Sequence, residues 1–101
     1  MSDTTSQNSN DAVTVEITKY RVVDAALAGH RDRRLFALQV QLTGDGTWTI
    51  HHLGEYLGED GRWGQEAHGF DLDTALERAK AEAPHVVVNG LTIGDVLAKQ
   101  K

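Results

Sequence analysis

The chain has 101 residues, a formal net charge of −5 and no cysteine, and its three serines all fall within the first ten positions. The two commonest side-chain nucleophiles are therefore missing from the part of the chain that we expect to fold, which argues against acyl-enzyme and thiolate chemistry. No apolar run is long enough for a membrane span or a signal peptide, so we predict a cytoplasmic location. The missing nucleophiles lead us to predict a non-enzymatic protein without a cofactor.

Residues 1–11 are polar and show no apolar periodicity, so we expect a disordered tail there. Residues 12–101 are long enough for one domain, and an apolar content of 40% predicts a small but real core. The usage, rich in Ala, Gly, Asp, Val and Arg, is typical of a GC-rich bacterial genome or of its phages.

The first predicted strand begins at the start of this domain. Val13, Val15 and Ile17 alternate with polar residues, which is typical of a half-buried strand. The apolar parity then changes, with Tyr20 as the next apolar position. We therefore expect a β-bulge or a bend near Lys19.

The clearest alternation, over residues 36–42, follows a polar turn at residues 29–33. A glycine-bearing loop at residues 44–46 then predicts a hairpin into the next strand. A loop of this length places Val40 opposite Ile50, so that both strands present apolar side chains to one face of the sheet.

A further turn is predicted at residues 58–61, with Tyr56 and Trp63 as a cross-strand aromatic pair on either side. The chain up to about Phe70 is thus predicted to form an antiparallel β-meander of three to four strands.

Residues 72–83 carry small and apolar side chains at helical spacing, with charged residues on the opposite side. Asp71 is suited to the N-cap of this helix, and Pro84 is suited to end it. We expect this main α-helix to pack on one face of the sheet, which defines an α+β fold. One covering helix leaves no room for a buried reaction chamber.

After the helix, residues 86–88 predict a short strand, and Asn89-Gly90 is a type I′ turn signal. Thr92 and Asp95 fit a variant capping box that opens a short C-terminal helix.

Carboxylates are concentrated in the second half of the predicted sheet and in the helix. Seven of them fall between residues 55 and 77, against one cation. Two aromatic residues of the kinds that dominate binding hot spots flank the turn in this stretch. We therefore predict a docking surface for a protein partner, formed by Tyr56, Glu59, Asp60, Arg62 and Trp63. Because no disulfide stabilises this small domain, we also expect self-association.

A nucleic-acid-associated protein is the alternative, using Arg31, Arg33 and Arg34 in a basic hairpin loop together with the polar sheet face. A three-stranded sheet backed by a helix also occurs in small DNA readers, including the arm-binding domains of phage integrases. The outward positions of the central strands, Gln39, Gln41, Thr49 and His51, lack cations, however, and the chain is acidic. Nucleic acid is therefore the weaker alternative.

The histidines offer a third class of site. His51 and His52 are adjacent on a predicted strand and point to opposite faces, so they are poorly placed to share a metal. We expect His52 to be a packed, hydrogen-bonded core residue. We predict no metal site. A site built from His51, His68 and Glu66 is the third alternative.

Overall fold

The computed structural model describes residues 12–99, so the tail predicted for residues 1–11 lies outside the described residues. Its strands are β2 (Lys19–Val22), β3 (Leu38–Leu42), β4 (Trp48–His52), β5 (Glu55–Leu57) and β6 (Trp63–Gly64). Its α-helices are α1 (Leu72–Glu82) and α2 (Ile93–Lys99), and its short 3-10 helices are η1 (Ala25–Leu27), η2 (Arg33–Phe36) and η3 (Ala83–His85). No helix in this part of the chain is long and apolar enough to cross a membrane.

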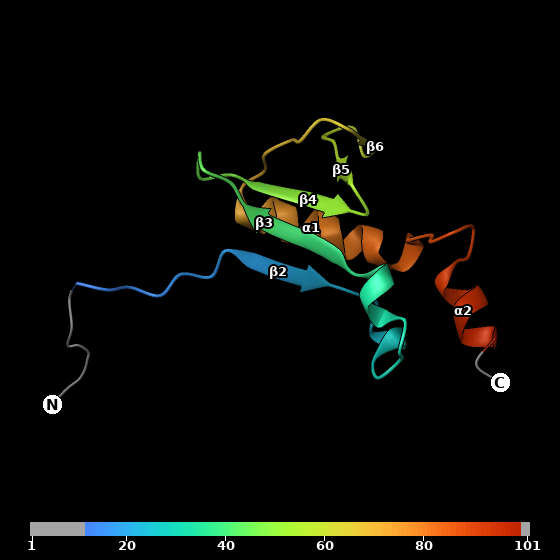
Figure 1. Ribbon diagram of the computed structural model, residues 1–101. Helices are drawn as coiled ribbons and strands as arrows, with labels where there is room; N and C mark the ends of the chain where they lie inside the picture. Colours follow the sequence, from blue (N-terminus) through green and yellow to red (C-terminus); the bar gives the residue numbers. More distant parts are fainter. Residues whose placement is uncertain (1–11, 100–101) are drawn as a thin grey trace, which may run out of the picture.

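The strands form one antiparallel sheet in the order β2-β3-β4-β5-β6, and α1 packs behind it (Figure 1). The predicted α+β class is confirmed, but the sheet has five strands rather than three to four. The additional strand arises at Leu53 and Gly54, where backbone φ angles of 48° and 87° reverse the chain between β4 and β5. This turn differs from the prediction because leucine rarely adopts a positive φ. Gly54 was its one local signal.

The central hairpin follows the predicted register. Val40 pairs with Ile50, and Leu42 pairs with Trp48. The loop at residues 44–46 is closed by a hydrogen bond of 2.8 Å from the Thr43 N–H to the Thr47 carbonyl. The local chemistry of the loop therefore sets which side chains face the helix.

The core lies between α1 and one face of the sheet. Val40, Ile50 and Leu57 form a buried cluster with Ala75 and Ala79, the small residues that α1 turns toward the strands. Because alanine has a short side chain, the helix axis can lie close to the sheet.

The capping of α1 matches the prediction. The Asp71 carboxylate accepts a hydrogen bond of 2.7 Å from the Thr74 N–H, and this bond holds the pKa of Asp71 below its usual value. The helix changes to η3 at Ala83, next to Pro84.

The predicted first strand is largely wrong. Val13, Val15 and Ile17 are 68%, 95% and 65% exposed, and residues 12–18 contain no strand. The structure shows no bulge at that position either, because β2 pairs with β3 in continuous register. The reason is tertiary: β3 ends at Leu42, whose N–H donates to the Thr18 carbonyl, so earlier residues have no neighbouring strand.

At the C-terminal end the predicted strand shrinks to one bridge between Val88 and Leu91. The type I′ turn between them is confirmed by φ angles of 52° at Asn89 and 77° at Gly90. The capping box is also confirmed. The Thr92 N–H donates to Asp95 over 2.9 Å, and the Asp95 N–H donates to the Thr92 hydroxyl over 3.1 Å.

Candidate functional site

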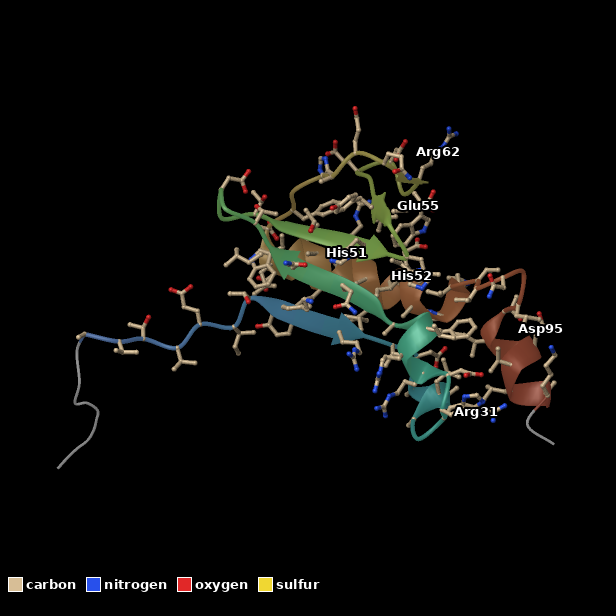
Figure 2. The ribbon with its side chains drawn as sticks, viewed as in Figure 1. Arg31, His51, His52, Glu55, Arg62 and Asp95 are labelled. Atoms are coloured by element: carbon tan, nitrogen blue, oxygen red, sulfur yellow. The ribbon has the colours of Figure 1, made fainter. Side chains whose placement is uncertain are left out.

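The hairpin between β5 and β6 carries the residues predicted to bind a protein. It is closed by a hydrogen bond of 2.8 Å from the Gly58 N–H to the Arg62 carbonyl, and Gly61 adopts a φ of 82°. The Asp60 carboxylate accepts from the Arg62 N–H over 3.0 Å, which stiffens the tip. Figure 2 shows Arg62 at the outer end of this hairpin, pointing away from the sheet.

The predicted aromatic pair across this hairpin is wrong. Tyr56 pairs with Gly64, whereas Trp63 pairs with Leu57. The two aromatic residues therefore lie on opposite faces of the sheet. The observed strand pairing is shifted by one residue from the pairing that the predicted four-residue turn implies. A shift of one residue moves every side chain of a strand to the other face of the sheet.

Each aromatic ring packs on a histidine of β4 instead. The Tyr56 ring lies 5.8 Å from the His51 ring on the open face. The Trp63 ring lies 6.3 Å from the His52 ring on the face that α1 covers.

All five predicted residues nevertheless border one shallow hollow of about 510 Å³ at this edge of the sheet. Its remaining wall comes from the segment that follows β6, including Glu66 and His68. The hairpin is fixed to α1 by Arg78, which donates to the Glu59 carbonyl over 2.8 Å and stacks over the Phe70 ring. The rim carries three carboxylates, Glu59, Asp60 and Glu66, and one arginine, Arg62, so the hollow is acidic.

The open face of the sheet, which α1 does not cover, is more basic than the sequence analysis allowed. The strand register brings Lys19 and Arg21 of β2 onto the same face as Gln39, Gln41 and His51. The outward positions of the central strands alone, without β2, carry no lysine or arginine. The apolar parity of β2 at Tyr20 and Val22 was the signal that could have placed the two cations there.

His51 lies at the centre of this face. Partial burial, followed by the positive charges of Lys19 and His52, lowers the pKa of His51 below its usual value. Its Nε2 lies 3.2 Å from the Gln41 amide oxygen.

The arginines predicted at a hairpin tip lie in the long connection between the antiparallel strands β2 and β3. The connection between β2 and β3 contains two 3-10 helices, and Arg33 and Arg34 lie exposed on η2. Figure 2 shows Arg31 reaching toward α2, where it borders a hollow of about 480 Å³ with Asp32 and Lys99.

His52 is hydrogen-bonded, as expected, with Nε2 2.8 Å from the Leu35 carbonyl, but it is half-buried and is not part of the core cluster. It also borders a hollow of about 220 Å³ with Glu55 and Glu82, although the sequence analysis expected no chamber beside the helix. Across residues 12–99, no group of three or more histidine or carboxylate side chains is placed to hold a metal ion.

The two histidine rings of the metal alternative each pack on an aromatic side chain. The His68 ring packs edge-on against Phe70, with 4.6 Å between centroids, while His51 packs on Tyr56.

Comparison with known proteins adds no relative. The chain matches no protein-family model, and neither a curated protein nor a solved structure shows significant similarity to it.

Proposed function

We propose that this chain is a non-enzymatic protein-interaction module that binds a basic segment of a partner protein at the β5–β6 hairpin. The observation that carries the proposal is the shared hollow. Five side chains selected from the sequence alone border one concave surface of about 510 Å³ at a sheet edge.

The chemistry of this hollow suits a cationic, extended partner segment. Trp63 and Tyr56 are both half-buried, so each leaves part of its ring available for contact. Exposed carboxylates at the rim favour encounter with lysine and arginine side chains. Because β6 is the outermost strand and only two residues long, its free edge can also accept a short strand.

Affinity capture from the native host, followed by mass spectrometry, tests the proposal. Glu66→Lys reverses a charge at the hollow, and Glu77→Lys makes the same change on α1, away from it. Both carboxylates are exposed, so neither variant is expected to unfold the domain. Proteins enriched by the wild type and by Glu77→Lys but lost with Glu66→Lys support the proposal. An identical set of captured proteins for all three chains contradicts it.

The second candidate function is nucleic-acid association through the open face of the sheet. The placement of Lys19 and Arg21 beside Gln39 and Gln41 favours it, because phosphate contacts and amide contacts to bases then share one surface. A DNA-shift assay at two salt concentrations tests this candidate, with Arg21→Ala as the variant and Arg62→Ala as the control. Binding at low salt that only Arg21→Ala weakens supports it. No shift at low salt contradicts it.

A further inference from the structure

Residues 13–18, called the arm below, leave the body of the domain as an extended segment (Figure 1). Its aliphatic residues Val13, Val15 and Ile17 are among the most exposed apolar side chains of residues 12–99. Within residues 12–99, the arm makes one main-chain bond to the sheet, from the Leu42 N–H of β3 to the Thr18 carbonyl. A strand-like pattern is therefore present without a strand beside it.

The arm continues directly into β2, and β2 is an outermost strand of the sheet. One edge of β2 pairs with β3, and none of residues 12–99 pairs with the other. Arm and edge together form an extended segment of ten residues, 13–22, and the row of main-chain groups that points away from β3 is available to another strand. Edges of this kind are usually blunted or covered in natural proteins.

The segment can pair with a second copy of itself. The two-fold axis between two identical antiparallel strands runs perpendicular to the sheet. Odd-numbered residues therefore face odd-numbered residues of the second copy, and even-numbered residues face even-numbered ones. Registers centred on Glu16, Lys19 or Arg21 place like charges directly opposite each other, which is unfavourable. A register centred on Ile17 avoids all three conflicts.

In this register the two Ile17 side chains meet at the axis. Val15 faces Lys19 of the second copy, and Val13 faces Arg21 of the second copy. The valines would cover the aliphatic stems of these long side chains and leave the charged ends in water. Each arm would thereby supply the missing neighbour of the other copy's β2.

We propose that residues 13–22 of two copies pair antiparallel about Ile17, which joins their two sheets into one continuous sheet across a homodimer. A second copy is the occupant that the chain itself specifies, because it carries both the free edge and the extended apolar arm that the edge lacks. This dimer leaves the β5–β6 hairpin at the opposite edge free, so it is independent of the function proposed above.

Single-cysteine cross-linking tests this register directly, because the natural chain contains no cysteine. Directly opposed residues of antiparallel strands lie about 4.5–5.5 Å apart between Cα atoms, within the range that a disulfide spans. Ile17→Cys is expected to form a disulfide-linked dimer under mild oxidation. Val87→Cys, which is 52% exposed and lies outside the arm, is the matched control and is expected to remain monomeric.

Analytical ultracentrifugation of the wild type and of Val15→Lys/Ile17→Lys gives a second, independent readout. Both side chains are exposed in the single chain, so the variant should keep the circular dichroism spectrum and melting temperature of a folded domain. We expect its dimer dissociation constant to rise by roughly 100-fold or more. A wild type that is monomeric at high concentration overturns the proposal, as does equal cross-linking by Ile17→Cys and Val87→Cys.

Discussion

The two faces of the sheet bury their residues in different ways, and neighbouring positions of β4 show the contrast. Ile50 is fully buried within the apolar cluster beneath α1. Thr49, the preceding residue, is 6% exposed on the open face and lies outside that cluster. Equal burial therefore does not mean an equal contribution. We infer that the covered face supplies most of the folding free energy, while the open face is left to polar side chains.

The largest effect is expected from a truncation on the covered face. Ile50→Ala removes buried methyl groups from a packed cluster and should lower the free energy of unfolding by about 2–5 kcal/mol. Thr49→Val on the open face should change it by less than about 1 kcal/mol, because the Thr49 hydroxyl makes one long bond of 3.4 Å to the Gln41 carbonyl. Urea unfolding of both variants measures the difference. Equal losses would show that both faces contribute alike.

A second prediction concerns the segment that passes from the hairpin back to β4. Phe70 pairs with Trp48, and a Cβ added at Gly69 would lie 2.2 Å from the Thr47 hydroxyl oxygen and 2.6 Å from the Thr47 Cβ. Gly69→Ala should therefore destabilise the domain by about 1–3 kcal/mol through overpacking.

Its control is a second substitution that removes the obstacle. Thr47→Gly eliminates both clashing atoms, so the double variant should lose less than the sum of the two single losses, as measured by urea unfolding. Additive losses would indicate that Gly69 matters for another reason.

The contrast between the faces also explains which parts of the fold could be predicted from the sequence. α1, its N-cap at Asp71, the capping box at Thr92 and the register of the central hairpin all depend on neighbours close in sequence. Each was predicted correctly. Local chemistry alone decides these features, and the covered face follows from them.

Features that depend on distant partners were predicted poorly. Val13 and Ile17 have the alternation of a strand, but β3 is too short to pair with them. The chain reversal at Leu53 depends on a positive φ that leucine seldom adopts. Both require knowledge of which strands lie side by side and where they end.

The candidate site shows the same division. The five residues border one hollow because the turn that joins them is local. The faces of Tyr56 and Trp63 were wrong by a one-residue shift in pairing. Lys19 joins the open face only through the pairing of β2 with β3.

A third prediction uses pH to probe the open face. The pKa of His51 is lowered in the folded chain by burial, then by Lys19 and His52. The unfolded chain therefore takes up a proton first as the pH falls through about 6.5, and the folded state loses stability below that value.

His51→Gln should reduce this acid sensitivity, measured as the difference in urea midpoint between pH 7.5 and pH 5. His85→Gln, at an exposed position after α1, is the control and should keep the wild-type difference. If both variants behave like the wild type, His51 does not report on the open face.

The smallest effect is expected at the hairpin tip between β3 and β4, where neither face is covered. Hydrogen bonds from the Thr43 and Thr47 side chains, followed by the Thr47 N–H, lower the pKa of Asp45 to about 2. The bond from the Thr47 hydroxyl measures 2.6 Å and that from the Thr47 N–H 3.0 Å. Because the folded pKa lies below the ordinary value of 3.8, the stability from this carboxylate is complete above pH 4.

That contribution should disappear as the pH falls from 4 toward 2, when the folded chain also takes up the proton. Asp45→Asn should therefore show a shallower loss of melting temperature over this interval than the wild type. The change is small because Asp45 is fully exposed, and water weakens its interactions. Added salt should leave the wild-type slope nearly unchanged, since short hydrogen bonds rather than distant charges hold the pKa down. A slope that salt abolishes would instead assign the effect to the overall charge of the protein.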